Sequence, residues 1–285
     1  MIPIALQEKL VPLVGKISEE SPVGGGCIHH AVRIETALGP FFMKWNEIGQ
    51  AHNFHVEARG LELLTESGNL AVPQILDEVK GGEYAGLVLQ WIEQGDMAND
   101  YFEVFGGNLA RLHQQTAHQF GLPYDNYIGS LPQYNTQHDK WTDFFRESRL
   151  LPQLRMEKAK ALLSSQTHKA FETLFVKIDS LIPEEKPAFL HGDLWGGNIL
   201  KGANGQAVII DPAVYFGHRE AEIAFMRLFD TYPQKFYDAY ESVNPLVSGW
   251  EERVDLFNLY PLLVHVNLFG GGYVEAVERI VKRYV

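Results

Sequence analysis

The spacing of apolar residues changes about a third of the way along the chain, and this change constrains the fold more than any other feature. Up to residue 92, short apolar segments with strand-like alternation surround one stretch of helical spacing, which runs through Phe54, Ala58 and Leu61. Gly68 is placed to end that helix. The order strand, strand, helix, strand, strand predicts an α+β lobe.

The remainder of the chain has a different pattern, which is mostly helical. We therefore predict an α+β, bilobal chain, with a small antiparallel-sheet N-lobe over residues 1–92 and a larger, mostly helical C-lobe over residues 93–285. Residues 141–181 favour two helices arranged around Pro152. A region between two lobes is a common place for a small ligand to bind.

Charge and composition exclude several classes of function. The chain has 285 residues and a net charge of -12, from 24 basic and 36 acidic residues, so nucleic acid is not an expected partner. No apolar run approaches the roughly 20 residues of a membrane helix, and no secretory leader is recognisable. The single cysteine, Cys27, excludes an intrachain disulfide and agrees with a cytoplasmic protein. We expect a monomer, with a dimer as the alternative.

The segment "FLHGDLWGGNIL" places polar residues between two apolar flanks that are expected to be short strands. Asp193 and Asn198 lie five residues apart in it, and Asp211 follows a second strand, "AVII". Mg²⁺ prefers oxygen ligands and takes few of them from protein, which suits Asn198 and Asp211. Asp193 would then accept the proton of an attacking hydroxyl. A turn stabilised by Asp and Asn side chains is the alternative.

The first lobe offers residues that suit phosphate binding. Alternation in the strand "FFMKW" predicts that Lys44 faces the same side as Phe42, where burial requires a partner, and Glu57 on the next helix is the candidate. A lysine paired with a glutamate that holds the nucleotide phosphates is typical of kinases. Gly24, Gly25 and Gly26 would let backbone amides approach phosphate oxygens. A surface lysine and an ordinary hairpin turn are the alternatives.

Taken together, these segments resemble the fructosamine kinase (ketoamine kinase) family within the protein-kinase-like and aminoglycoside phosphotransferase superfamily. The resemblance rests chiefly on "HGDLWGGNIL" and "IIDPAVYFGHREAEIA", and it extends over nearly the whole chain through "GGGCI", "FFMKWN", "HVEARGLELL" and "NLFGGGY". It implies a protein-kinase-like fold. It also implies ATP-dependent phosphorylation of the 3-hydroxyl of a sugar-derived ketoamine, either free or protein-bound, in protein deglycation and repair.

The resemblance also implies roles for individual residues. Asp193 is the catalytic base, Asn198 and Asp211 bind Mg²⁺, and Lys44 supported by Glu57 binds the phosphates of ATP. Backbone groups at the junction of the lobes would hold adenine, at Gln90, Trp91 and Ile92.

On the acceptor side, Trp195, His218 and Glu220 are candidate substrate residues. The alternatives are that Trp195 is packed under the loop and that His218 fixes its loop by hydrogen bonds. Arg219, which lies between His218 and Glu220, could likewise pair with a nearby carboxylate. His191 is expected to support the catalytic loop. Cys27 is a candidate redox residue, because a thiol beside phosphate-binding amides has a lowered pKa; a small packed residue is the alternative.

Two other functions remain open from the sequence. A different small-molecule kinase, of the aminoglycoside or choline kinase type, would use the same catalytic residues with another acceptor. A non-catalytic nucleotide-binding protein is disfavoured, because each expected catalytic position is filled.

Overall fold

The computed structural model describes residues 1–24 and 29–284 and divides into two compact units. Unit 1 comprises Met1–Tyr101 and Gly197–Pro212, and unit 2 comprises Phe102–Gly196 and Ala213–Val285. The first unit therefore extends nine residues past the predicted boundary at residue 92, and it recruits a later segment of the chain. Spacing of apolar residues could not reveal that recruitment, because it depends on long-range pairing rather than on local pattern.

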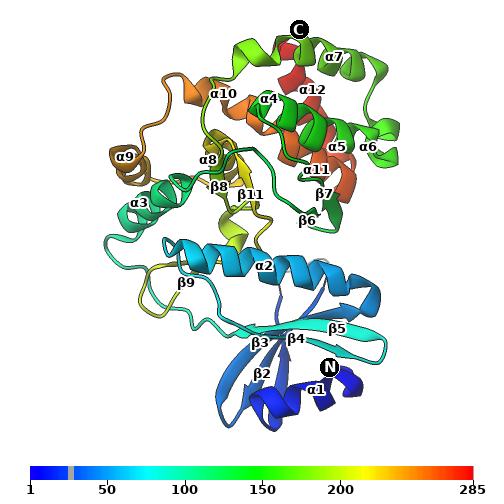
Figure 1. Ribbon diagram of the computed structural model, residues 1–285, viewed down its shortest axis with the longest axis vertical. Coiled ribbons are helices and arrows are strands. Elements are labelled where there is room, and N and C mark those ends of the chain that lie inside the picture. Colours follow the sequence, from blue (N-terminus) through cyan, green and yellow to red (C-terminus); the bar gives the residue numbers. More distant parts are fainter. Residues whose placement is uncertain (25–28, 285) are drawn as a thin grey trace. The chain divides into compact units, whose positions relative to one another are not determined.

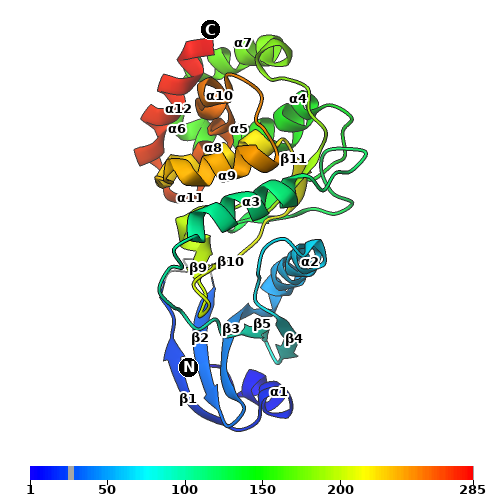
Figure 2. The same cartoon turned by 90° about the vertical axis from the view of Figure 1, so that its left-hand side faces the viewer.

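Unit 1 is built on a five-stranded antiparallel sheet in the order β1-β2-β3-β5-β4 (Figure 1 and Figure 2). Its strands are β1 (Ile17–Pro22), β2 (His30–Thr36), β3 (Gly39–Glu47), β4 (Ile75–Gly81) and β5 (Tyr84–Gln90). The sequence did not indicate β1, because this edge strand, "ISEESP", is polar and mostly exposed or half-buried and so lacks a buried alternating face. The last two strands of the predicted order, β4 and β5, form a hairpin in which Gly81 pairs with Tyr84.

Two helices cover opposite faces of this sheet (Figure 1). The helix α1 (Ile4–Val14) packs Leu6 and Leu10 against Met43, on one face. On the other face lies α2 (Ala51–Ser67), which is preceded by the 3-10 turn Ile48–Gln50 and ends at Gly68 with a left-handed φ of 68°, as predicted. Alternation along β3 explains the division, since Met43 faces α1 while Phe42 and Lys44 face α2.

The later segment of unit 1 is a short hairpin. A 3-10 turn (Gly196–Asn198) leads into β9 (Ile199–Lys201), which pairs with β10 (Ala207–Ile209). The hairpin joins the rest of the unit through backbone hydrogen bonds from Ile209 to Ala71 and from Gly95 to Lys201.

Unit 2 is mostly helical, as predicted (Figure 2). Its short strands form the pairs β6–β7 and β8–β11. The elements of unit 2 are α3 (Tyr101–His113), β6 (Asn126–Ile128), β7 (Leu131–Gln133), α4 (Trp141–Phe144), the π-helix Phe145–Leu150, α5 (Leu151–Arg155), α6 (Glu157–Leu162), α7 (Ser165–Leu181), β8 (Ala188–Leu190), β11 (Tyr215–Gly217), α8 (Arg219–Phe229), α9 (Gln234–Val243), α10 (Trp250–Phe257), α11 (Leu259–Phe269), a 3-10 turn (Gly271–Tyr273), α12 (Val274–Val281) and a final 3-10 turn (Lys282–Tyr284).

The prediction of a helix boundary at Pro152 was wrong in its position. Pro152 lies in the first turn of α5, where its missing N–H removes no helical hydrogen bond, and the helical path continues into it from the π-helix Phe145–Leu150. The breaks fall instead at Met156 and Leu163, which have extended backbone conformations.

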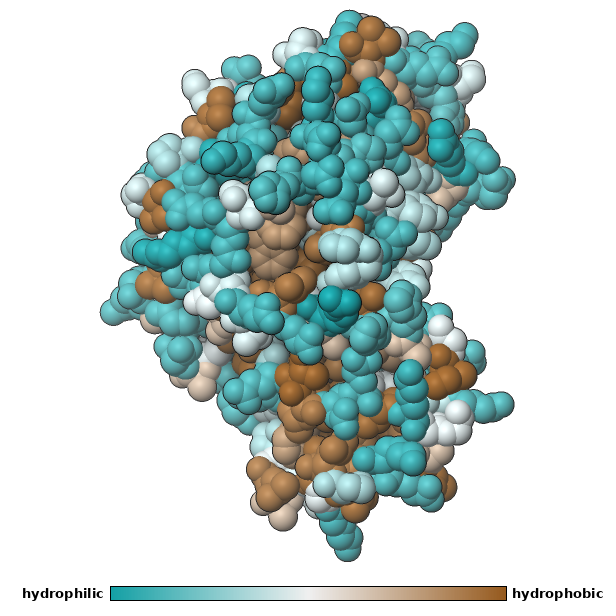
Figure 3. All heavy atoms as spheres, in the orientation of Figure 1, coloured by the Kyte–Doolittle hydropathy of each residue, from teal (hydrophilic) through white to brown (hydrophobic). Residues whose placement is uncertain are grey.

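Hydrophilic residues cover most of the visible face of the molecule, as the net charge of -12 leads one to expect (Figure 3). Among residues 1–24 and 29–284, every helix is too short or too polar to cross a lipid bilayer.

Candidate active site

Three charged side chains from distant parts of the sequence meet in unit 1. Nζ of Lys44, on β3, lies 2.8 Å from Oε1 of Glu57 on α2 and 2.5 Å from Oδ1 of Asp211, which follows β10. The predicted Lys44–Glu57 pair is therefore present. The side chains of Lys44 and Glu57 are only 10% and 14% exposed, so neither charge is balanced by bulk water.

The electrostatics of this cluster keep Lys44 charged. Burial lowers the pKa of Lys44, but the charges of Asp211 and Glu57 outweigh it and raise that pKa above its usual value. Burial raises the pKa of Glu57, and the attraction of Lys44 opposes this effect. The cluster thus presents a fixed ammonium group held by two carboxylates, which is the group that a polyphosphate requires.

Asn198 and Asp211 lie at the same end of the β9–β10 hairpin. The backbone N–H of Ile210 donates to the carbonyl of Asn198 at 3.0 Å, directly before Asp211. Asp211 has a φ of 57°, the sole left-handed value of a non-glycine residue among residues 1–24 and 29–284. Aspartate tolerates this conformation better than most residues, and it turns the chain sharply after β10.

The side chains of this hairpin end are of the type that holds Mg²⁺. A carboxylate and a carboxamide oxygen are hard ligands, and Mg²⁺ takes one or two such groups from protein and completes its shell with phosphate and water. Asp211 is 39% exposed at its side chain, so one face of the carboxylate is open to such a ligand.

The catalytic-loop segment around Asp193 belongs to unit 2, and its approach to Asn198 and Asp211 stays a prediction. Gly192 has a φ of 85°, and a Cβ atom on it would lie 2.0 Å from the carbonyl oxygen of Ala213, so only glycine fits. The ring of His191 accepts the backbone N–H of Asp193 at 3.3 Å, while its own carbonyl accepts from Ala213. His191 is fully buried, and the expectation that it supports the loop is confirmed.

A buried carboxylate, which the sequence analysis missed, holds the backbone of this loop by hydrogen bonds. Glu222, on α8, accepts the backbone N–H groups of His191 at 3.1 Å and Gly192 at 2.7 Å. It also bonds to Nε2 of His113 at 3.0 Å, and Nδ1 of His113 in turn bonds to the hydroxyl of Tyr240. The only signal was a glutamate on the apolar side of α8, which a single sequence does not distinguish from a surface residue.

Burial of Glu222 raises its pKa, but the hydrogen bond from His113 and the other donors outweigh burial and keep that pKa below its usual value. The carboxylate is therefore charged at neutral pH, and it accepts from both amides that precede Asp193.

Two of the three predicted substrate residues have a structural role instead. The side chains of His218 and Glu220 are 0% and 1% exposed. His218 caps α8 by accepting the N–H of Glu220 and contacts the carbonyl of Pro183. Glu220 forms a two-pronged ion pair with Arg253. Their assignment to the substrate is corrected, because neither offers surface to a ligand.

The neighbouring residues agree with this correction. Arg219 forms a two-pronged pair with Glu185, the alternative that the sequence left open for it. Donor atoms of Glu185, His218 and Glu220 lie within 4.8 Å of one another, but both carboxylates are already neutralised by arginine, which argues against a metal there. Trp195 is 39% exposed and its ring lies edge-on to Phe229 at 6.3 Å, so it remains available to a ligand.

The predicted nucleotide loop is only partly described. Gly24 is exposed with open space around its Cα, whereas Gly25, Gly26 and Cys27 lie outside the described residues, and so do the phosphate-binding and redox predictions made for them. Just beyond, His29 bonds to Asn46 at 3.1 Å and lies against Phe54, on the same face of the sheet as Lys44.

At the end of β5, the predicted adenine-binding residues follow one another. The backbone N–H of Gln90 donates to the carbonyl of Gln74, so this N–H is not available to adenine. The ring of Trp91 is half-buried under the guanidinium of Arg33, at 4.8 Å. Ile92 is also half-buried. Adenine contacts at these three positions stay a prediction.

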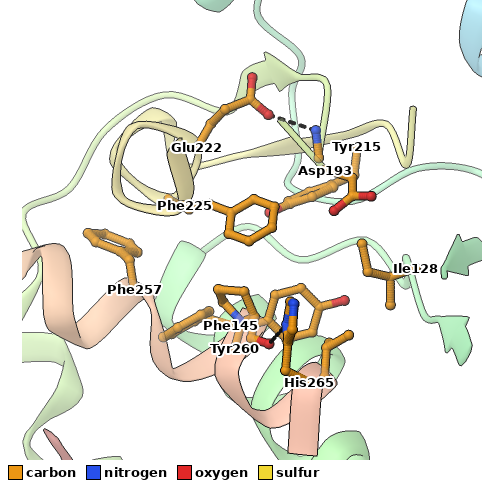
Figure 4. A pocket seen from close by; sticks show the side chains of 13 residues that line it. Ile128, Phe145, Asp193, Tyr215, Glu222, Phe225, Phe257, Tyr260 and His265 are labelled. Carbon is orange, nitrogen blue, oxygen red and sulfur yellow. Dashed lines mark hydrogen bonds between the residues drawn. The ribbon is translucent and has the colours of Figure 1, made fainter. Parts of the chain in front are cut away.

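A pocket in unit 2 opens beside Asp193 (Figure 4). Aromatic rings form a large part of its walls, including those of Tyr215, Phe225, Tyr260 and His265. The sequence analysis missed Phe225, Tyr260 and His265 because "NLYPLLVHV" and "AEIAFM" have the spacing of ordinary core helices. A pocket that contains the predicted base is the natural place for an acceptor.

Comparisons with known proteins identify the family of the chain. The model of the fructosamine kinase family matches residues 5–285. The chloroplastic protein-ribulosamine 3-kinase of Arabidopsis thaliana is 37% identical over 279 residues, covering 95% of this chain and 83% of that protein. A probable ketoamine kinase of Synechocystis, slr1563, is 36% identical over 271 residues, covering 94% of this chain and 90% of that protein.

A solved structure shares the fold over the full length. The crystal structure of a putative fructosamine-3-kinase from Thermobifida fusca superposes with a TM-score of 0.85 at 35% identity, covering 98% of this chain and 99% of that chain. The predicted α+β kinase-like fold and the resemblance drawn from the motifs are both confirmed. The chain belongs to the fructosamine kinase family.

Proposed function

We propose that the protein is an ATP-dependent kinase that phosphorylates the 3-hydroxyl of a sugar-derived ketoamine, such as a fructosamine or a ribulosamine. The observation that carries this proposal is the cluster of Lys44, Glu57 and Asp211, which supplies a fixed cation and a partly exposed carboxylate of the type that Mg²⁺ prefers. Membership of the fructosamine kinase family supports a hydroxyl acceptor. The name of the Arabidopsis relative supports a ketoamine as the substrate class.

Each residue of the cluster has a defined task in the proposed reaction. Lys44 neutralises charge on the nucleotide phosphates, and Glu57 keeps its ammonium group in place. Asn198 and Asp211 would hold Mg²⁺, which, when bound, supplies further charge neutralisation to the phosphates. Gln90, Trp91 and Ile92 would border the adenine.

Asp193 has the proton-transfer role. The 3-hydroxyl oxygen of the ketoamine attacks the γ-phosphorus, the bond between that phosphorus and the β,γ-bridging oxygen breaks, and ADP leaves. Asp193 orients the hydroxyl and accepts its proton. The products are ADP and a ketoamine 3-phosphate, whose breakdown frees the amine and would give the protein a part in deglycation.

The experiment that tests the function is a measurement of ATP consumption with a panel of free and protein-bound fructosamines and ribulosamines, aminoglycosides and choline. We expect ADP to form with ketoamines, and the phosphate to be found on the 3-hydroxyl by mass spectrometry and NMR. Turnover of choline or an aminoglycoside, without turnover of any ketoamine, would contradict the proposal.

A variant separates catalysis from binding. Asp193→Asn keeps the shape of the side chain but removes the proton acceptor, so we expect turnover to fall by about 100-fold or more while ATP affinity is retained. Loss of ATP binding and turnover together would indicate that Asp193 is structural.

A further inference from the structure

The pocket beside Asp193 has the properties of a site for an apolar amine. All of its lining residues belong to unit 2. Figure 4 shows Phe225 on one side of the pocket and Tyr260 and His265 on the opposite side, with the carboxylate of Asp193 at the edge. We call this pocket, with its aromatic rings and the carboxylate of Asp193, the slot.

The charges that line the slot are of one sign. Its lining contains the carboxylates of Asp193 and Glu222 and the imidazole of His265, and none of the described lining residues is a lysine or an arginine. Burial lowers the pKa of His265, so its ring is neutral at pH 7. Nδ1 of His265 donates to the carbonyl of Pro261 at 2.7 Å, which leaves Nε2 as an acceptor. The slot therefore disfavours an anion and favours a cation.

One aromatic wall is better suited than the others to face a cation. The guanidinium of Arg149, which does not line the pocket, already lies 4.0 Å from the ring of Tyr215 and 5.4 Å from the ring of Tyr260. Its charge weakens the attraction of those two rings for a second cation. Phe225 also lines the slot, and the rings that Arg149 contacts are instead those of Phe144, Tyr215 and Tyr260.

Exposed aromatic rings continue outward from the slot. The ring of His265 lies 4.9 Å from Phe229, 5.4 Å from Phe269 and 4.9 Å from Tyr273. We call Trp195, Phe229, Phe269 and Tyr273 the aromatic rim. Three of its members are 39%, 42% and 57% exposed: Trp195, Phe229 and Phe269. Such a group of exposed rings beside a pocket is typical of a binding surface.

We propose that the slot and the aromatic rim bind the amine-derived part of the acceptor, and that its preferred substituent is alkyl or aryl rather than carboxylate-bearing. This inference rests on the proposed function. In a ketoamine the amine nitrogen is four covalent bonds from the 3-hydroxyl oxygen, a span of about 5 Å. When Asp193 binds the 3-hydroxyl, the secondary ammonium group therefore lies in the slot, against Phe225. The substituent on the nitrogen then extends outward to the aromatic rim.

The test measures binding rather than turnover. Ribulosamine analogues that lack the 3-hydroxyl cannot be phosphorylated there, so their affinity, measured by calorimetry, does not depend on the kinase reaction. We expect the benzylamine and butylamine derivatives to bind about 10-fold or more tightly than the carboxyethylamine derivative. Equal affinities, or tighter binding of the carboxylate, would overturn the inference. Failure of the proposed function would appear separately, as absence of turnover with the 3-hydroxy compounds.

Two variants locate the site. Phe225→Leu keeps apolar bulk but removes the ring face, and Phe229→Ala shortens the exposed rim. We expect each to weaken binding of the benzylamine derivative about 5-fold or more, with little change for the carboxyethylamine derivative. Val176→Ala, on α7 and outside the pocket, is the matched control, since Val176 is 86% exposed.

The two variants also protect the test against a folding defect. Phe225 is only 7% exposed, so its substitution can disturb the core, whereas Phe229 is 42% exposed and its substitution should not. Thermal melts identify a misfolded variant, and Phe229→Ala alone then decides the outcome. Wild-type affinity of a folded Phe229→Ala variant for the benzylamine derivative would overturn the assignment of the rim.

Discussion

Oε1 of Glu222 accepts the backbone N–H of Gly192 at 2.7 Å, one residue before the proposed catalytic base. The same carboxylate accepts from His191 and bonds to His113, so a single buried charge satisfies three donors. The position of Asp193 within unit 2 therefore depends on Glu222, which lies thirty residues after Gly192 in the chain. Glu222 is a positioning residue, because it acts on Asp193 through the backbone.

Glu222→Gln tests this dependence. The amide offers one acceptor oxygen in place of two and adds an unwanted donor, so one buried N–H is left unsatisfied, at a cost of about 1–3 kcal/mol. We expect kcat to fall at least 10-fold and the midpoint of urea unfolding to fall, while KM for ATP changes little. Unchanged kcat in a destabilised variant would assign Glu222 to stability alone.

Lys44→Met tests the phosphate-binding cluster. The substitution keeps the length of the side chain but leaves Glu57 buried without its partner and removes the cation. We expect kcat/KM for ATP to fall about 100-fold or more, and nucleotide binding to be less dependent on ionic strength. Lys80→Met, at an exposed position of β4, is the control and should behave as wild type. Equal activity of the two variants would contradict the assignment.

Asp211→Asn separates the charge of Asp211 from its backbone conformation. Asparagine also tolerates the left-handed φ of 57°, so the turn after β10 should persist. Loss of the carboxylate removes a metal ligand and one partner of Lys44. We expect activity to fall at least 100-fold, and the Mg²⁺ concentration needed for half-maximal activity to rise. An activity and a Mg²⁺ response like those of wild type would exclude Asp211 as a ligand.

Much of this site could be predicted from the sequence, because its residues lie in local motifs. Alternation in β3 placed Lys44 on the face of α2, and the spacing of α2 placed Glu57 toward it. Asp211 and Asn198 were predicted as ligands from their positions at strand ends. The local sequence pattern could not predict the ion pair between Lys44 and Asp211, which lie 167 residues apart.

The missed residues have a common physical cause. Glu222, Phe225 and Tyr260 lie on helices whose apolar spacing is that of a core, and only the packing of α8 against α10 and α11 turns those side chains toward Asp193. His218 and Glu220 were overvalued for the opposite reason. Their position just past Asp211 suggested a site, yet the ion pair with Arg253 accounts for Glu220 and the N-terminus of α8 accounts for His218.

His29 gives a prediction for the pH dependence of stability. Burial, together with the positive charge of Lys44, lowers the pKa of His29 to about 4, against 6.5 in the unfolded chain. Asp211 opposes this shift and His30 adds to it. Because the folded pKa is depressed, the neutral ring favours the folded state fully above pH 6.5, and this contribution is lost as the pH falls from 6.5 toward 4.

His29→Gln should remove this pH-dependent contribution to the free energy of unfolding. Gln has no group that titrates in this range, and it can still bond to Asn46, the neighbour of His29 in the structure. We expect wild type to lose about 1–2 kcal/mol more stability than the variant between pH 7.5 and pH 4.5, after allowance for the partial solvent exposure of the ring. Urea unfolding of both proteins at the two pH values measures the difference. Parallel loss of stability in the two proteins would show that His29 titrates normally and that its contact with Phe54 does not exclude water.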